Sequence, residues 1–218
     1  MIIHNAPQGS EAWEQIRKGR ATGSEFNRVL TPAKLQFAAG ARTYACQLAA
    51  ERLGVESEPS APSFWMDRGT ELEPYARMDF AHLTGESLQE VGFIMPHIDA
   101  TYGCSVDALV GEDATLEIKC PAAEHLIQWH WSGLIPVDHV IQCQFSLWVT
   151  GRNRCHFYGW HPEIEPLHLV SQRDEKYMAA FESAMPKLEE MVQEILSKIT
   201  KRTATRMNLD AELEGFDD

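Results

Sequence analysis

Long hydrophobic runs are missing from this sequence of 218 residues. No apolar stretch approaches the roughly 18 residues that a membrane-spanning helix requires, so we expect no membrane partner. The first five residues, Met1 to Asn5, lack a basic stretch followed by an apolar core. We therefore expect no secretory signal, and a cytoplasmic location follows as the default.

Closely spaced cysteine pairs are also missing. The chain has five cysteines, an odd number, and none forms a Cys-x-x-Cys pair (Cys46, Cys104, Cys120, Cys143, Cys155). This pattern argues against both a structural zinc site and a disulfide framework. We interpret the cysteines as reduced thiols, most of them in the core.

Basic charge is scarce. Lys and Arg together number 19 against 32 Asp and Glu, which gives a formal net charge of −13. A protein that holds nucleic acid by bulk electrostatics needs clustered Lys and Arg to neutralise phosphates. The composition argues against that mode of binding, so a nucleic-acid function would require local positive charge.

The remaining composition is that of an ordinary globular chain, with 44% hydrophobic and 23% charged residues. The length fits one domain, residues 1–218, and we expect the acidic end, 210–218, to be frayed. Hydrophobic periodicity predicts helices at 11–30 (in two pieces), 34–53, 66–83, 122–132, 137–149 and 174–200. Alternating patterns predict strands at 102–110, 114–120, 154–160 and 165–171. Helices on either side of a central set of strands predict an α/β fold with a central mixed β-sheet flanked by helices.

The strongest chemical signal is Asp107 followed by Glu117 and Lys119. Alternate side chains of a strand share a face, so Glu117 and Lys119 point the same way, as do Ser105 and Asp107. A hairpin centred on Glu112 places Asp107 opposite Glu117, and Ser105 opposite Lys119, with Cβ atoms about 5 Å apart. Two opposed carboxylates repel unless a cation lies between them, and Mg²⁺ prefers such ligands. The alternative is a solvent-facing hairpin with a surface Glu–Lys pair.

These residues resemble the core motif of the PD-(D/E)xK nuclease superfamily, with Ser-Val-Asp in place of the usual Pro-Asp. Further segments resemble the phage lambda exonuclease family and run in order along most of the chain. The segments are Trp13 to Gly19, Thr22 to Glu25, Gly103 to Asp107, Leu116 to Pro121, Gln142 to Thr150 and Arg173 to Ala179. The resemblance implies a restriction-endonuclease-like core.

Members of that family are Mg²⁺-dependent 5′→3′ exonucleases on duplex DNA that assemble as trimeric rings. They serve phage-type recombination beside a single-strand annealing protein. The resemblance therefore implies a homotrimeric toroid of phage or prophage origin that acts on double-stranded DNA ends, with Mn²⁺ able to replace Mg²⁺. A ring that encircles DNA needs only modest basicity in its channel, which would reconcile the acidic charge with DNA binding.

The resemblance also assigns a catalytic centre. It implies that Asp107, Glu117, the backbone carbonyl of Ile118 and the helical Glu73 are metal ligands, and that Lys119 is the catalytic lysine. A surface glutamate on a helix is the alternative for Glu73.

The same resemblance assigns a pocket for the terminal 5′-phosphate to Arg17, Ser24, Ser105 and Gln142. Arg17 offers a fork of donors suited to phosphate. The run Thr22 to Glu25 fits a capping box, which would place Ser24 in the first helical turn, where backbone N–H groups favour anions. The alternative for Ser24 is an ordinary capping role. Helical geometry predicts that Gln144, unlike Gln142, is a satisfied structural amide.

Two further features are less decided. The resemblance places a strand-separating apolar residue near Trp65 and Met66, with Met66 the better candidate, although a packing role is equally open. The run Trp129-His130-Trp131 favours packing or subunit contact over base stacking. The competing functions are another nuclease of the superfamily, endonucleolytic or 3′-directed, and a non-catalytic DNA-end-binding recombination scaffold.

Overall fold

The computed structural model describes residues 1–55 and 64–214, with side chains described for 1–55 and 68–199. A five-stranded sheet forms its centre, in the order β3-β6-β7-β8-β9. The strands are β3 (Leu88–Gln89), β6 (Ala108–Val110), β7 (Ala114–Lys119), β8 (Arg154–His161) and β9 (Ile164–Gln172). β7 runs parallel to β8, and the other neighbouring strands are antiparallel. The predicted mixed sheet is confirmed.

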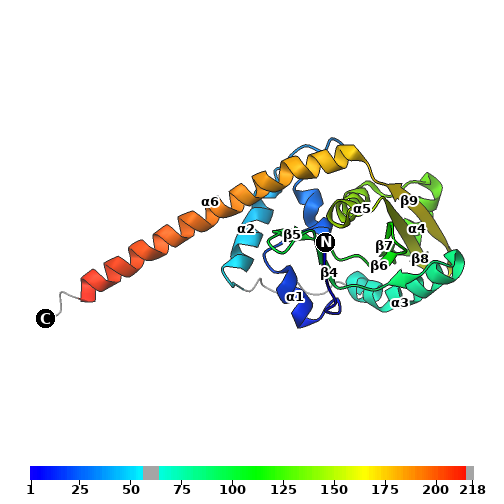
Figure 1. Ribbon diagram of the computed structural model, residues 1–218, viewed down its shortest axis with the longest axis horizontal. Helices are drawn as coiled ribbons and strands as arrows, with labels where there is room; N and C mark the ends of the chain where they lie inside the picture. Colours follow the sequence, from blue (N-terminus) through cyan, green and yellow to red (C-terminus); the bar gives the residue numbers. More distant parts are fainter. Residues whose placement is uncertain (56–63, 215–218) are drawn as a thin grey trace.

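Some of the helices pack on this sheet, and others lie to one side of it (Figure 1). The helices are α1 (Glu11–Arg17), the 3-10 helix η1 (Gly23–Arg28), α2 (Ala41–Arg52), α3 (Phe64–Thr84), α4 (Ala123–Ser132), α5 (Val137–Thr150) and α6 (Glu175–Glu214). α3 packs on β7 and β8, and α5 packs on β7, β8 and β9. The predicted flanking helices are therefore present.

The central strand β7 is buried from Ala114 to Ile118. Leu116 packs in a cluster with Phe80 of α3. Thr115, the residue before Leu116, faces the opposite side of the sheet, and its hydroxyl lies 3.3 Å from that of Ser146 on α5. Because alternate residues share a face, Glu117 lies on the side of the sheet that α5 covers. The side chain that carries the chemistry is thus held inside the protein.

A second core lies beneath the N-terminal half of α6. The rings of Phe26, Phe145 and Phe181, from η1, α5 and α6, have centroids 4.7 to 5.4 Å apart. Two small sheets attach the N-terminal segment: β1 (Ile2–His4) pairs with β4 (Phe93–Met95), and β2 (Ala21–Thr22) pairs with β5 (Tyr102–Gly103). These pairings bring α1 and η1 toward the strand that precedes the hairpin.

Gln144 is a structural amide, as predicted from its place on the helix. It is 2% exposed. Its Nε2 donates to the Ser171 hydroxyl (2.8 Å) and the Gln172 carbonyl (2.6 Å), and its Oε1 accepts from the backbone N–H of Asp174 (2.9 Å). These bonds tie α5 to the junction between β9 and α6.

Three helix predictions need correction. The helix predicted at 34–53 begins only at Ala41. Leu35 has a positive φ of 52°, and Phe37 forms an isolated β-bridge with Leu30, so the chain before Ala41 is not helical. Pro74, predicted near the first turn, lies well inside α3. The helix predicted to begin at Thr22 is a 3-10 helix, and Thr22 makes no capping hydrogen bond, so no capping box forms.

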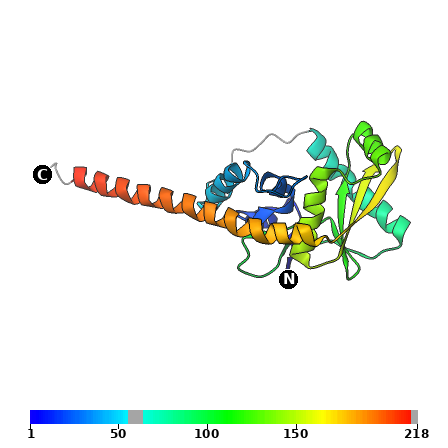
Figure 2. The ribbon, with the colours of Figure 1, turned by 90° about the horizontal axis from the view of Figure 1, so that it is seen from above.

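α6 is much longer than predicted. It continues past residue 200 to Glu214, through part of the segment 210–218 that was predicted to be frayed; residues 215–218 lie outside the described chain. Its N-terminal half packs on α2 and α5, and its C-terminal half extends away from the body (Figure 2). Its 40 residues correspond to about 60 Å. Within the described residues, no helix is long and apolar enough to cross a membrane.

Candidate active site

The end of β7 carries an ion pair in the interior of the protein. Lys119 Nζ lies 2.6 Å from Glu117 Oε1, and the side chain of Glu117 is 3% exposed. The pairing follows from the pleat, because residues two apart on a strand share a face. The alternative of a solvent-facing Glu–Lys pair is therefore wrong.

Asp107 lies beside the same strand, just before β6. Its backbone N–H donates to the Leu116 carbonyl (3.1 Å), and its Oδ2 accepts from the backbone N–H of Ile118. The ladder pairs Ala108 with Leu116, which is the register of a hairpin centred on Glu112. That part of the predicted register is confirmed, and it brings Asp107 next to Glu117.

The register does not extend to Ser105. β6 begins at Ala108, so the predicted pairing of Ser105 with Lys119 is not formed. The Ser105 hydroxyl instead accepts a hydrogen bond from Trp13 Nε1 (2.9 Å). The pleat pattern failed here because the chain before Asp107 leaves the sheet.

Glu73 reaches the same region from α3. It forms an ion pair with Arg77, whose other guanidinium nitrogen lies 2.8 Å from Glu90. Burial raises the pKa of Glu73 to about 7, with a further contribution from the charge of Asp107, while Arg77 and Lys119 act in the opposite direction. Glu73 is thus electrostatically part of the site.

Burial and neighbouring charges also shift the pKa values of Glu117, Asp107 and Lys119. Burial raises the pKa of Glu117 to about 7, Lys119 opposes this shift, and Asp107 and Glu73 add to it. Burial also raises the pKa of Asp107, against the effects of Lys119 and the Ile118 N–H. For Lys119, burial disfavours the charge, but Glu117 and Asp107 outweigh it and raise the pKa. Three carboxylates therefore share one lysine.

This donor set fits a hard divalent cation. The candidate ligands are the carboxylates of Glu73, Asp107 and Glu117 and the carbonyl of Ile118, all oxygen donors. Burial, and to a smaller extent the neighbouring carboxylates, raises the pKa values of Glu73 and Glu117, and a bound cation would stabilise their charged forms. In the conformation described, Asp107 and Glu73 are engaged by the Ile118 N–H and by Arg77, and no group of three or more acidic, His or Cys side chains among the described residues is arranged to hold a metal.

Arg17 lies at the end of α1, with its guanidinium carbon 4.0 Å from the centroid of the Trp13 ring. Among the described residues it forms no ion pair, and its Nε is buried without a hydrogen-bond partner. Burial lowers its pKa, while Tyr44 and nearby glutamates act in the opposite direction. Trp13 also bonds the Ser105 hydroxyl, so one indole joins two of the predicted phosphate residues.

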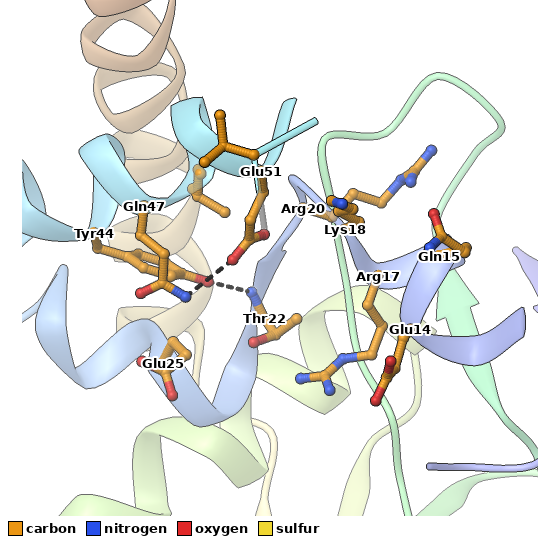
Figure 3. A pocket seen from close by; sticks show the side chains of 12 residues that line it. Glu14, Gln15, Arg17, Lys18, Arg20, Thr22, Glu25, Tyr44, Gln47 and Glu51 are labelled. Carbon is orange, nitrogen blue, oxygen red and sulfur yellow. Dashed lines mark hydrogen bonds between the residues drawn. The ribbon is translucent and has the colours of Figure 1, made fainter. Parts of the chain in front are cut away.

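A cavity of about 550 Å³ opens next to Arg17 (Figure 3). Arg17, Lys18 and Arg20 line it from the segment that ends α1, and Tyr44 and Glu51 line it from α2. The hydroxyl of Tyr44 accepts from the backbone N–H of Thr22 (3.0 Å), which fixes the chain entering η1. Glu14 and Glu25 also line the cavity, so its three cations face three carboxylates and the lining as a whole carries no excess of positive charge.

Gly23, the residue before Ser24, lies against the part of α5 that carries Gln142. A Cβ added at Gly23 would lie 3.1 Å from the Phe145 ring and 3.5 Å from the Gln142 carbonyl, so glycine lets η1 lie against α5. Ser24 is exposed, and its hydroxyl lies 3.3 Å from that of Thr22. No hydrogen bond or ion pair joins Ser24 or Gln142 to Arg17 in the part of the chain that the structure describes.

The sequence from residue 12 to 153 matches the family described as "YqaJ-like viral recombinase domain". The chain belongs to this family. The resemblance to the phage lambda exonuclease family is thereby confirmed.

Solved structures agree with this assignment. LHK-Exo, an alkaline exonuclease from Laribacter hongkongensis, is 30% identical with a TM-score of 0.81, over 90% of this chain and 99% of that chain. A crystal structure of LHK-Exo in complex with dAMP gives 29% identity and a TM-score of 0.80 over the same shares. A phage related exonuclease from Haemophilus somnus, 13% identical over 83% of this chain and 96% of its own, has a TM-score of 0.62 and shows the fold alone. The fold is of the PD-(D/E)xK type.

One curated relative also matches this recombinase-domain protein. ExoD of Escherichia coli (strain K12) is 38% identical over 64 residues, which cover 28% of this chain and 74% of ExoD.

The remaining predictions for this YqaJ-like domain have mixed outcomes. Met66 lies in α3, but its side chain is outside the described residues, so the strand-separating role stays a prediction. Trp129 packs against Phe157, with ring centroids 5.6 Å apart, whereas Trp131 is 91% exposed. The cysteines are free, as predicted, and three of the five are buried.

Sequence reasoning missed Trp13, Arg77 and His139, all of which adjoin the site. Trp13 is four residues before Arg17 on one helix, and Arg77 is four residues after Glu73 on another. That spacing brings side chains together on a helix and was available as a signal. His139 had no such signal, because its place beside Lys119 arises from the packing of α5 on the sheet.

Proposed function

We propose that this protein is a Mg²⁺-dependent 5′→3′ exodeoxyribonuclease. It degrades one strand of linear double-stranded DNA from a 5′-phosphate end to mononucleotides. The 3′ single-stranded tails that remain are substrates for a single-strand annealing protein in recombination. The observation that supports this most is the convergence of Glu73, Asp107, Glu117 and Lys119 in a chain of the YqaJ-like family.

In this proposal the residues of the site have different roles in hydrolysis. Glu73, Asp107, Glu117 and the carbonyl of Ile118 would hold the metal. Bound Mg²⁺, or Mn²⁺ in its place, supplies activation of water and stabilisation of charge on the phosphate. Lys119, held by Glu117 at 2.6 Å, is placed to orient the attacking water and to stabilise its deprotonated form.

End selection is assigned to Arg17, Ser24, Ser105 and Gln142. Arg17 is the main contributor because it is partly buried, forms no ion pair among the described residues and keeps a buried Nε without a hydrogen-bond partner. Lys18 and Arg20 line the same cavity, together with Glu14, Glu25 and Glu51. Arg17 would thus hold the phosphate end on an acidic chain, and a homotrimeric ring would keep the enzyme on its substrate.

Digestion of linear duplexes labelled at the 5′ or the 3′ end of one strand tests this function. Mg²⁺ should be required, the 5′ label should appear first as mononucleotide, and the 3′ label should remain in long products. First release of the 3′ label would establish a 3′-directed nuclease, and cutting of closed circular DNA would establish an endonuclease. DNA-end binding without hydrolysis in Mg²⁺ or Mn²⁺ would leave a recombination scaffold.

A further inference from the structure

A second pocket, of about 690 Å³, opens beside the catalytic lysine. Glu73, Ile118 and Lys119 line part of it, so the pocket is continuous with the candidate metal site. The rest of its lining includes the rings of Trp129 on α4 and His139 on α5. The pocket therefore joins a site for a phosphate and a cation to an aromatic surface.

The two aromatic side chains are fixed by packing. The ring of His139 lies 5.6 Å from that of Phe157 at 27°, and the ring of Trp129 meets that of His139 edge-on at 79°. Trp129 also lies against the backbone of Gly159, where an added Cβ would be 3.3 Å from its ring. Both side chains are only partly buried, so each keeps surface toward the pocket. They form a rigid wall.

This wall does not suit a phosphate. Burial, with a smaller contribution from the charge of Lys119, lowers the pKa of His139 to about 4, so its imidazole is neutral at neutral pH. Glu124, which is exposed and lines the same pocket, contributes negative charge, and His125 beside it is also exposed. A phosphate is favoured near Lys119, whereas the wall favours a flat, uncharged group.

A nucleotide carries both parts, a phosphate and a flat uncharged base. We infer that Trp129 and His139 form the wall of a nucleoside subsite, against which the base packs when the attached phosphate lies at the Lys119 site. This inference rests on the proposed nuclease function, and it adds a contact between the enzyme and the base of its substrate. Aromatic contact uses the face or edge of a base without reading its hydrogen-bonding pattern, so all four bases are accepted. Degradation of DNA of any sequence requires such tolerance.

The contact between the base and the aromatic wall can be measured by the binding of a mononucleotide, which the enzyme does not cleave. Calorimetric titration in Mg²⁺ should show that dAMP binds wild-type protein at least about fivefold more tightly than 2-deoxyribose 5-phosphate, which lacks a base. His139→Ala and Trp129→Leu should weaken dAMP binding by about fivefold or more and leave the sugar phosphate unchanged. His139→Phe, which keeps a ring, should retain most of the dAMP affinity.

Trp131→Ala is the matched control, because Trp131 is two residues from Trp129, 91% exposed, and not part of the pocket. It should change neither affinity. Equal binding of dAMP and the sugar phosphate to wild type would overturn the subsite, as would an equal loss for both ligands in His139→Ala with an unchanged melting temperature. The nuclease function would survive that result if labelled duplex is still digested, whereas a failure to digest duplex overturns the function itself.

Discussion

Lys119 and Glu117 form an ion pair in which each charge compensates for the burial of the other. Removal of one partner leaves a buried charge without compensation, which is costly in a protein interior. A metal held by Glu117 would neutralise that carboxylate in place of the lysine. Lys119 would then be available to the attacking water, as the proposed function requires.

Lys119→Ala should lower the rate of cleavage by about 10²- to 10⁴-fold, because it removes the group that we propose orients and activates water. Affinity for Mg²⁺ should be retained, since Lys119 is no ligand and its removal takes away a competing cation. Cleavage of labelled duplex and calorimetric titration with Mg²⁺ measure the two effects. Lys198→Ala, on the exposed face of α6, is the control. A variant with more than about a tenth of the wild-type rate contradicts the role of Lys119.

The carboxylates predict how pH acts on the metal-free protein. The pKa values of Glu73 and Glu117 are raised from 4.5 to about 7, so the folded state binds their protons more tightly than the unfolded state. The stability from these protons is present below about pH 4.5 and is lost as the pH rises to about 7. The melting temperature without metal should fall over this range, and Mg²⁺ should restore it most above pH 7 because metal and protons compete.

Scanning calorimetry at several pH values, with and without Mg²⁺, measures this. Glu73→Gln, which lacks one of the carboxyls with a raised pKa, should show a smaller fall. A melting temperature that rises steadily across the interval without metal would show that these carboxyls are not protonated as described.

Arg17 predicts a preference for phosphorylated ends. Wild-type enzyme should digest a duplex with a 5′-phosphate faster than the same duplex with a 5′-hydroxyl. Arg17→Ala should lose about 10- to 150-fold of this preference, because a hydrogen bond to a charged group contributes roughly 1.5–3 kcal/mol. The ratio of initial rates on the two substrates is the measurement, with Lys187→Ala, an exposed lysine of α6 outside both cavities, as the control for a general charge effect. Equal slowing of both substrates by Arg17→Ala would make Arg17 a general DNA contact.

At the scale of elements, the position of Glu73 depends on how α3 is attached to the sheet. Asp79 Oδ2 accepts from the Tyr158 hydroxyl (2.6 Å) and from Trp160 Nε1 (3.0 Å), both on β8. Burial, together with this bond to Asp79, raises the pKa of Tyr158. Asp79 therefore joins the helix that carries Glu73 to the strand next to β7.

Asp79→Ala should lower the free energy of unfolding by about 1.5–3 kcal/mol, because two donors lose a charged acceptor. It should also weaken Mg²⁺ binding through displacement of Glu73. Urea denaturation and calorimetric titration measure the two effects. Glu71→Ala, an exposed change on the same helix, should leave both unchanged. Normal stability in Asp79→Ala would show that α3 is held by its apolar contacts alone.

Sequence patterns predicted correctly those elements in which the hydrophobic periodicity of a helix or strand runs without interruption. The helix at 137–149 and the strands at 154–160 and 165–171 agree with α5, β8 and β9 within about two residues. The pattern failed at 34–40, where Leu35 takes a left-handed conformation that no periodicity reports. The helix predicted at 66–83 agrees with α3 within two residues, but Pro74 lies well inside it rather than near its first turn, where a missing N–H would cost least.

The site was predictable to a similar extent. The pleat gave the shared face of Glu117 and Lys119, and the turn gave the proximity of Asp107. The ion pair of Glu73 with Arg77 and the place of His139 depend on how α3 and α5 dock on the sheet. Docking angles are set by side-chain packing across residues far apart in sequence, which a single sequence does not report.

At the scale of the whole molecule, the acidic net charge and the exposed apolar side chains are both compatible with assembly into a ring. Large apolar residues are exposed on α3 (Tyr75, Met78, Leu83) and on and after α4 (Ile127, Trp131, Leu134). Contacts between different surfaces of two copies are head-to-tail, and they form a ring where the rotation between copies closes. The family resemblance implies the same assembly.

Light scattering on the purified protein should report three chains per particle. The value should hold at high salt if apolar contacts maintain the assembly, because salt screens only the charged ones. A stable monomer at working concentration would contradict the ring, and the net charge of −13 would then need another explanation.

The parallel pairing of β7 with β8 has a consequence for synthesis on the ribosome. β7 is complete at Lys119, but the strand that pairs with its whole length spans Arg154–His161. A nascent chain passes through an interval in which the catalytic carboxylates exist but the sheet that holds them does not. Parallel strands joined by a long connection form late, after the intervening helices have emerged. A ribosome-bound chain therefore acquires nuclease competence only when most of the polypeptide has been made.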